Sequence, residues 1–404
     1  MIPMDEAVRI VMDSTKRLHT TRVPLIDALG HTLSEDVVSD INMPPFEKAT
    51  MDGYAVLGTD VAAAARDSPV ILEVVEEIQA GSVPTKVVSA GAASRIMTGA
   101  PMPDGADTVI MVEDTETENG LVRVFEPTQP GQNRVPLGED VREGDVVLTA
   151  ERRVRPPEIG ILAAVGVTRV PVYRRPVVGV VATGDEIVEP GNNPAPGQIR
   201  NSNGYSMATQ VVRAEGTPKY LGIAGDTVEE LRRVMEEGLE TCDVLLLSGG
   251  VSAGVYDLVQ GVMCDLGVSV LFDRIKMKPG KPLTFGVCGS KLVFGLPGNP
   301  VSSLVGLELL VRPALRTMQA MSDCHRLRIK AKIRASFSQK TGREQFVPAY
   351  TTQEGGAWTT RWVGHHGSAD LFSISEANSL FVVDAERDTV EAGEEVDVVQ
   401  LFEW

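Results

Sequence analysis

Between residues 176 and 322, continuous apolar runs alternate with stretches of helical spacing. The runs at residues 177–181, 244–247 and 292–294 contain no polar residue, which is typical of strands buried on both faces of a sheet. Stretches with helical patterns, such as 203–214, separate them. Because parallel strands need crossover connections, this alternation predicts a three-layer α/β domain with a mostly parallel sheet.

Glycine and lysine are concentrated in loops beside these strands. Glycine turns leave backbone N–H groups free to bind anions, lysine adds positive charge, and proline lowers the entropy lost in holding a loop. We interpret the loops as a phosphate or oxyanion pocket at the carboxyl ends of the sheet. The alternatives are a tight strand-to-helix turn for the first loop and solvated lysines in the second; the signature of P-loop NTPases is absent from the sequence. The three loops are Ser248-Gly249-Gly250-Val251-Ser252-Ala253-Gly254, Lys278-Pro279-Gly280-Lys281-Pro282 and Gly295-Leu296-Pro297-Gly298-Asn299-Pro300.

Three carboxylates follow three successive strands of this region. Glu186 comes after the first strand, Asp226 after the second and Asp257 after the third. Each alone would be an ordinary loop acid, and Asp226 would also serve as a helix N-cap. Together, at one rim of a parallel sheet, they predict Mg²⁺ held between carboxylates and substrate phosphates.

Composition excludes several classes of function. The chain has 38 Lys and Arg against 55 Asp and Glu, a formal charge of −17, so we expect no nucleic-acid partner and no membrane partner. Its aromatic content of 5% is low for a base-stacking surface. The sequence begins without a secretion signal and has no apolar run that would span a bilayer, and its four cysteines form no C-x-x-C pair. We therefore expect a cytoplasmic protein with reduced thiols.

The remaining sequence predicts further units, and the expected fold class is multidomain α/β plus β. Residues 1–45 and 138–175 form a discontinuous N-terminal linker and dimerisation domain, in which 141–170 is expected to pack against an amphipathic helix at 4–18. Residues 46–137 form an inserted β-rich domain, with strands at 70–78 and 108–112. Residues 176–322 are the α/β domain. Strict alternation at 327–334 begins a small C-terminal β-barrel-like domain at 323–404.

At the level of motifs, the chain resembles the molybdopterin molybdenumtransferase (MoeA) family, to which the gephyrin E domain is related. The resemblance follows the order of the motifs along nearly the whole chain. The motifs are Met51-Asp52-Gly53-Tyr54-Ala55, Ile96-Met97-Thr98-Gly99-Ala100-Pro101, Gly138-Glu139-Asp140, Thr183-Gly184-Asp185-Glu186, Asn201-Ser202-Asn203, Ser248-Gly249-Gly250-Val251-Ser252, the lysine loop, and Gly295-Leu296-Pro297-Gly298-Asn299-Pro300-Val301-Ser302.

This resemblance implies a transferase of molybdenum cofactor biosynthesis, a molybdenum insertase. Such an enzyme cleaves adenylylated molybdopterin with the help of Mg²⁺, transfers molybdate to the dithiolene and releases AMP. The resemblance also implies a homodimer with its active site between subunits. The pathway adenylyltransferase and molybdoenzyme apoproteins are the further partners that it implies.

The resemblance assigns roles to residues that pattern alone would leave at the surface. The catalytic residues are Asp52, Thr98, Glu186, Asp226 and Asp257, of which the last three are also the metal ligands. Asp52 and Thr98, from the insertion, are expected to face the α/β domain of a partner chain. The substrate-binding residues are Gly249, Gly250, Ser252, Lys278, Lys281, Asn299, Ser302, Arg343 and Ser368.

Two positions depart from the family pattern. Val135, with Arg134 beside it, stands where the family often has an arginine. Asp370 follows the Ser368 loop and places a negative charge near the expected molybdate path.

Two other functions remain open from the sequence. The pathway adenylyltransferase resembles residues 177–320 alone, and a gephyrin-like scaffold would lack catalysis. The additional domains and Asp52 argue against the first, and the retained carboxylates and lysines argue against the second. Release of AMP, synthesis from ATP, or neither would distinguish the three.

Overall fold

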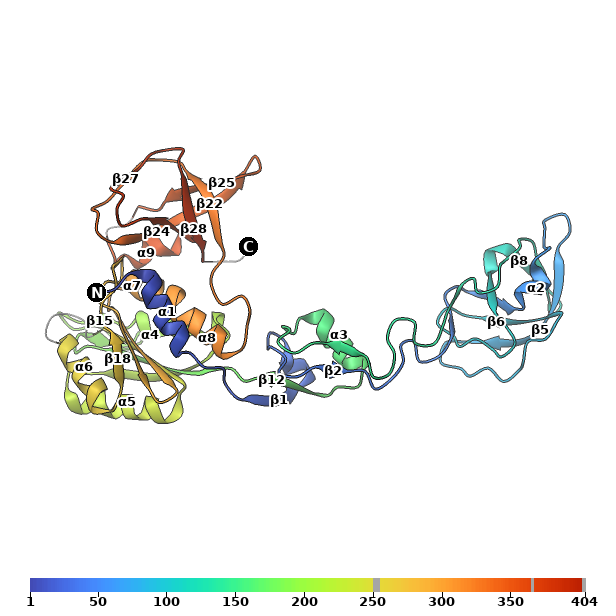
Figure 1. Ribbon diagram of the computed structural model, residues 1–404, viewed down its shortest axis with the longest axis horizontal. Helices are drawn as coiled ribbons and strands as arrows, with labels where there is room; N and C mark the ends of the chain where they lie inside the picture. The colour runs from blue at the N-terminus through green and yellow to red at the C-terminus, as the bar shows by residue number, and fades with distance from the viewer. Residues whose placement is uncertain (250–254, 365–366, 402–404) are drawn as a thin grey trace.

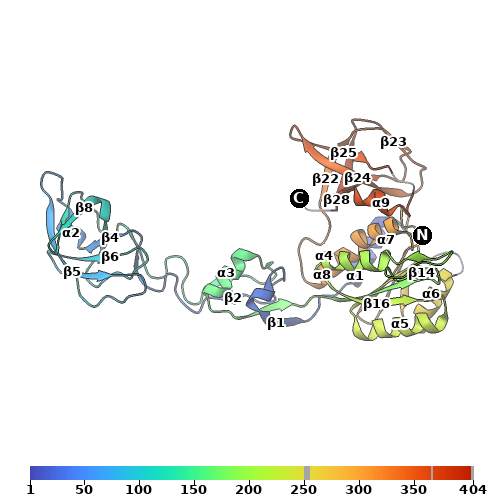
Figure 2. The ribbon, with the colours of Figure 1, turned by 180° about the vertical axis from the view of Figure 1, so that it is seen from behind.

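The computed structural model describes residues 1–249, 255–364 and 367–401, with the backbone alone for residues 255–257. The molecule is elongated, and Figure 1 shows three bodies along its length. The α/β unit and the C-terminal strands lie together at one end, a small unit containing α3 (Pro156–Ala164) lies in the middle, and the insertion lies at the far end. The view from behind shows the same order (Figure 2).

The α/β unit is built on a six-stranded sheet. Its order is β16-β13-β17-β21-β20-β18, in which the first four strands are parallel and β20 is antiparallel to both of its neighbours. Buried Val, Leu and Phe residues fill the central strands, which is why the sequence showed no polar interruption there. The strands are β13 (Val177–Thr183), β16 (Thr217–Ala224), β17 (Val244–Ser248), β18 (Ser269–Phe272), β20 (Thr284–Cys288) and β21 (Lys291–Leu296).

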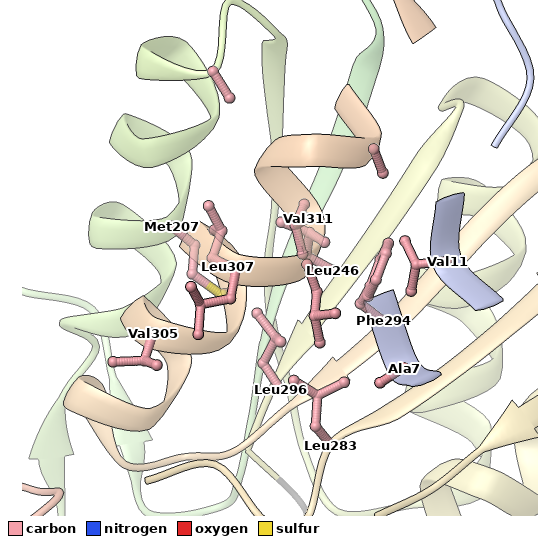
Figure 3. Close-up of a cluster of buried hydrophobic side chains, with 14 of the residues drawn as sticks. Ala7, Val11, Met207, Leu246, Leu283, Phe294, Leu296, Val305, Leu307 and Val311 are labelled. Carbon is pink, nitrogen blue, oxygen red and sulfur yellow. The ribbon is translucent and has the colours of Figure 1, made fainter. Parts of the chain in front are cut away.

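Helices cover both faces of this sheet and confirm the three layers. Leu245 and Leu247 face one core, with α5 (Val228–Thr241) and α6 (Val255–Asp265), while Leu246 faces the other. Figure 3 shows Leu246 and Phe294 of the sheet against Met207 and Val311 of the second helical layer. That layer consists of α1 (Met4–Ser14), α4 (Asn203–Arg213), α7 (Pro300–Gly306), the π-helical turn η3 (Leu307–Val311) and α8 (Arg312–Met318).

The N-terminal helix packs differently from the sequence-based expectation. Met4, Ala7 and Val11 are buried in the α/β core, beside α8 and η3, and not against residues 141–170. The expected packing was wrong because helical periodicity identifies an apolar face but not its partner. Residues 141–170 instead contribute to the core of the middle unit.

The middle unit is made by two separate stretches of chain. Antiparallel pairs join β1 (Thr20–Pro24) to β12 (Arg169–Tyr173) and β2 (Val37–Val38) to β11 (Val146–Leu148). A 3-10 turn, η1 (Leu25–Ala28), and α3 complete its core.

The insertion is mostly β-structure, as expected. Its six-stranded sheet has the order β7-β4-β6-β5-β9-β8, and β3 pairs with β10 at its base. The elements are β3 (Lys48–Ala49), β4 (Gly53–Val56), α2 (Gly58–Val61), β5 (Val70–Ile78), β6 (Ala92–Ile96), β7 (Thr108–Met111), η2 (Val112–Asp114), β8 (Thr115–Glu118), β9 (Leu121–Val124) and β10 (Arg134–Val135).

The C-terminal strands close into a five-stranded barrel. Its order is β24-β25-β22-β28-β26, and a further pairing of β26 with β24 closes it, which confirms the barrel-like fold. Within the described residues, no helix is both long and apolar enough to cross a bilayer. The elements are β22 (Arg328–Ile333), β23 (Phe337–Ser338), β24 (Glu344–Glu354), β25 (Ala357–Trp362), α9 (Leu371–Ser375), β26 (Ser379–Val383), β27 (Thr389–Val390) and β28 (Glu395–Gln400).

Candidate functional site

A cleft of about 1170 Å³ lies at the carboxyl ends of the parallel strands, between the α/β unit and the C-terminal barrel. Eight of the residues that the sequence assigned to the site line it. Two short strands, β14 (Ile187–Val188) and β15 (Ile199–Arg200), form part of its wall. The eight residues are Glu186, Gly249, Lys278, Lys281, Asn299, Ser302, Arg343 and Ser368.

The lysine loop is fixed between the two units. Its first residues form β19 (Met277–Lys278), which pairs in parallel with the start of β24 in the barrel. Lys278 aligns with Gln345, so Arg343 of the barrel comes next to the loop. The loop closes on itself, since the Ile275 N–H donates to the Lys281 carbonyl at 3.0 Å. Lys278 and Lys281 are both exposed in the cleft, without an ion-pair partner among the described residues.

Gly249 is required by the packing of the strand ends. It has φ +108°, and an added Cβ would lie 2.3 Å from the Thr183 carbonyl oxygen of the neighbouring strand. Only glycine allows the chain to leave β17 at this point. The predicted site residues Gly250 and Ser252 and the side chain of Asp257 lie outside the described residues.

The first turn of α7 meets the C-terminal unit at Ser368. The sequence placed Asn299 as the N-cap and proline at the first helical position, and α7 does begin at Pro300. The Asn299 side chain does not cap the helix, however, because its Nδ2 donates to Ser368 Oγ at 2.9 Å. The Val301 N–H donates to the Ser368 carbonyl at 3.0 Å, so two contacts hold this serine beside buried Ser302.

Acidic groups gather at the same rim of the sheet, after the carboxyl ends of β13 and β16. The Asp226 N–H donates to Asp185 Oδ1 at 3.0 Å, and burial, followed by the charges of Asp185 and Glu186, raises the pKa of Asp226. Asp226 Oδ1 is buried without a hydrogen-bond partner. Asp226 is not the helix N-cap, because Thr227 accepts the Glu230 N–H. Glu186 lines the cleft, whereas Asp226 is not among the residues that line it.

Asp52 and Thr98 form a separate pair in the insertion. The backbone N–H and hydroxyl of Thr98 both donate to Asp52 Oδ1, at 2.7 and 2.8 Å, and these bonds lower the pKa of Asp52. The pair is exposed and belongs to the far end of the molecule from the cleft (Figure 1). Within one chain the structure therefore does not bring Asp52 together with Lys281.

At the two positions that depart from the family pattern, Arg134 beside Val135 and the acidic Asp370 each have a local partner. Arg134 forms an ion pair with Glu47, next to the short β3–β10 ladder. Asp370 is the N-cap of α9 and accepts the Ser373 N–H at 3.2 Å. The negative charge of Asp370 is thus partly compensated by the helix start that it caps.

The sequence reasoning missed several residues of the cleft wall, including Thr183, Arg200, Asn203 and Gln345. Asn203 makes two contacts there, from Nδ2 to Ser248 Oγ at 2.8 Å and to the Gly298 carbonyl at 2.7 Å. The signal for Asn203 was its place in Asn201-Ser202-Asn203, directly before a predicted helix. No pattern pointed to Gln345, whose position depends on pairing between distant strands.

Comparison with known proteins agrees with this architecture. Three family models match consecutive parts of the chain: the MoeA N-terminal region (domain I and II) at residues 2–166, a probable molybdopterin binding domain at 179–317, and the MoeA C-terminal region (domain IV) at 330–401. An elongated chain that carries these regions in this order has the domain composition of a MoeA-type protein.

Similarity to individual proteins extends over the full length. The chain is 37% identical to the molybdopterin molybdenumtransferase of Bacillus subtilis, over 100% of this chain and 94% of that protein. It is 34% identical to molybdopterin molybdenumtransferase 2 of Mycobacterium tuberculosis, over 99% and 100%. A crystal structure of the MoeA protein from Pyrococcus horikoshii superposes with a TM-score of 0.87 at 33% identity, covering 100% of both chains. The chain therefore belongs to the molybdopterin molybdenumtransferase (MoeA) family.

Proposed function

We propose that this chain is a molybdenum insertase of molybdenum cofactor biosynthesis, with adenylylated molybdopterin and molybdate as substrates and AMP as a product. One observation carries the proposal. Two lysines, an arginine and two serines, from the α/β unit and the barrel, converge on one cleft at the carboxyl ends of a parallel sheet. Family membership supports the same reaction.

The basic wall of the cleft suits a tetrahedral dianion. Lys278, Lys281 and Arg343 would form charge-assisted hydrogen bonds to molybdate oxygens, and Ser302 and Ser368 would add hydroxyl donors. The same positive groups would stabilise the charge that develops on oxygen as the phosphoanhydride is cleaved. Because these donors are held by β19 and by α7, little reorganisation is needed when the substrate binds.

The acidic rim fits a hard divalent cation. Asp226 has a buried oxygen without a hydrogen-bond partner among the described residues, and its pKa is raised by burial first and then by the charges of Asp185 and Glu186. A bound cation would stabilise the ionised carboxylate against both effects. Among the described residues, no group of three Asp, Glu, His or Cys side chains is arranged so that it could hold a metal ion by itself. Mg²⁺ typically takes one or two carboxylates and completes its shell with substrate phosphates. We propose that its carboxylate ligands come from Glu186, Asp226 and Asp257, and the bound ion would neutralise phosphate charge.

A second copy of the chain would complete the site. Asp52 and Thr98 lie at the far end of the molecule from the cleft of their own chain (Figure 1). In a two-fold homodimer the insertion of one protomer would reach the cleft of the other. We propose this arrangement with the four units bounded as expected from the sequence, except that α1 belongs to the α/β unit.

The proposal also places the protein in the cytoplasm, between two other classes of protein. An adenylyltransferase would supply its activated substrate, and apoproteins of molybdoenzymes would accept the finished cofactor. No nucleic acid and no membrane enters this scheme.

The test is an assay of AMP release from adenylylated molybdopterin, with Mg²⁺ present and with or without molybdate. The proposal expects AMP release that accompanies incorporation of molybdenum into the dithiolene. Consumption of ATP to adenylylate molybdopterin would instead identify an adenylyltransferase. No turnover by a folded, dimeric protein would identify a scaffold.

A further inference from the structure

We propose that Asn203 is a positioning residue that holds the oxyanion wall of the cleft in place. It is the first residue of α4, and its amide nitrogen donates to two loops at once. One acceptor is Ser248 Oγ at the end of β17, and the other is the Gly298 carbonyl in the loop before α7. A single side chain thus joins three of the segments that line the cleft.

The start of α4 is itself firmly held. Asn201, which is 3% exposed, accepts the Gly204 N–H at 2.9 Å through Oδ1 and donates from Nδ2 to the Tyr220 hydroxyl at 2.8 Å. That hydroxyl donates to Glu189 Oε1 at 2.7 Å, and Tyr205 donates to the other oxygen of Glu189 at 2.9 Å. Because every member of this chain has a partner, Asn203 projects from a fixed point.

The hydrogen bonds of Asn203 connect onward to the C-terminal unit; we call this series of contacts the tether. Gly298, which accepts from Asn203, is followed directly by Asn299, whose Nδ2 donates to Ser368 Oγ. The Val301 N–H holds the Ser368 carbonyl. If the Asn203 bond is lost, the segment that carries both contacts to Ser368 loses one of the links that hold it at the sheet rim, while its connection to β21 and the hydrogen bond from the Gly249 N–H to the Leu296 carbonyl remain. Asn203 would therefore set the position of Ser368 without touching the anion itself.

The role of Asn203 in catalysis rests on the proposed function. Its hydrogen-bonded link to the loop before α7 can be tested without assuming that function. Amide hydrogen exchange over residues 297–302, measured at the four residues there that are not proline, should be about tenfold faster in Asn203→Ala than in the unaltered protein, because the hydrogen bond to the Gly298 carbonyl is lost. Asn203→Asp has the same shape but no hydrogen to donate to Gly298, so it should show the same acceleration. Thr209→Ala is the matched control, since within the described residues that exposed hydroxyl on the same helix bonds only to the Ser206 carbonyl.

The second measurement concerns binding and turnover. Asn203→Ala should raise the Kd and KM for molybdate about tenfold while leaving the KM for adenylylated molybdopterin unchanged, and Thr209→Ala should change neither. A general loss of structure would instead raise the KM for both substrates together. If the unaltered protein neither binds molybdate nor releases AMP, the proposed function fails and the exchange rates alone decide on the tether. Unchanged exchange over residues 297–302 in both Asn203 variants would overturn the inference.

Discussion

Lys278 and Lys281 show how the backbone sets the role of a side chain. Both belong to a loop whose ends are held by β19 and by the Ile275 to Lys281 hydrogen bond, so the ammonium groups stay at the cleft. Lys276 is only two residues from Lys278 and is also exposed, but it does not line the cleft. A difference in environment, and not in chemistry, therefore separates these lysines.

Replacing Lys281 by alanine should weaken molybdate binding by about 10- to 100-fold, because a charge-assisted hydrogen bond is lost. Lys276→Ala removes the same charge from the neighbouring surface and should leave the Kd within about twofold. Isothermal titration of both variants with molybdate measures the difference. Equal effects of the two substitutions would mean that only the net charge matters.

Asp226 should impose a pH dependence on stability. Its pKa is raised above the ordinary value of 3.8, so the folded protein retains a proton that the unfolded chain has released. Stability is therefore lost as the pH rises from that value through the folded pKa. Asp226→Asn, which cannot ionise, should be more stable than the unaltered protein at pH 7, and the two should converge below about pH 4.

The same substitution should lower the rate of AMP release by about 100-fold, since a proposed ligand of Mg²⁺ is removed. Denaturant unfolding across pH, together with the AMP assay, tests both effects. A variant that is less stable at pH 7, or that keeps full activity, would contradict this role for Asp226.

Among the elements, the strands could be predicted best because burial on both faces leaves an unbroken apolar run. The sequence placed strands at 177–181 and 244–247, and β13 and β17 cover both. The two-residue β19 has no such pattern, and its partner β24 lies in another unit. The proximity of Arg343 and Gln345 to the lysine loop follows from that pairing, so local sequence could not reveal it.

The turn after β17 should not tolerate a side chain. Gly249→Ala combines a positive φ with a clash against the Thr183 carbonyl, and it should destabilise the α/β unit by about 1–3 kcal/mol. Gly261→Ala is the contrasting control, because that glycine lies in α6 with no atom within 4 Å of an added Cβ. It should stabilise by up to about 1 kcal/mol. Equal unfolding midpoints for the two variants would refute the steric argument.

The start of α3 depends on an ionised glutamate. Glu158 is 1% exposed, and hydrogen bonds from Arg155, together with Arg152, lower its pKa to about 2 from an ordinary 4.5. Its contribution to stability is therefore complete above pH 4.5 and is lost as the pH falls towards 2. Glu158→Gln should cost about 1–2 kcal/mol at pH 7 and less at about pH 3. If the difference in unfolding free energy between Glu158→Gln and the unaltered protein does not change with pH, the stabilising role of the ionised Glu158 is contradicted.

At the scale of the whole molecule, the insertion lies at one end and the α/β unit with the barrel lies at the other (Figure 1). Asp52 of the insertion is therefore far from the cleft of its own chain. The α/β core and the barrel could be expected from the sequence, since each has its own hydrophobic pattern. The separation of Asp52 from Lys281 within one chain was expected through the family resemblance alone, because no local pattern specifies how the three bodies are arranged. If Asp52 takes part in the reaction as proposed, a second chain would have to supply it to the cleft.

Complementation between two variants tests most directly whether the insertion of one chain completes the cleft of another. Asp52→Ala and Lys281→Ala homodimers should each release little AMP at a molybdate concentration near the Kd of the unaltered protein, because every site lacks one residue. After mixing and subunit exchange, half of the dimers would be mixed, and each would contain one intact site. About a quarter of the full activity should therefore return. Mixed dimers, confirmed by mass spectrometry, that remain inactive would show that the insertion of one chain does not complete the cleft of another.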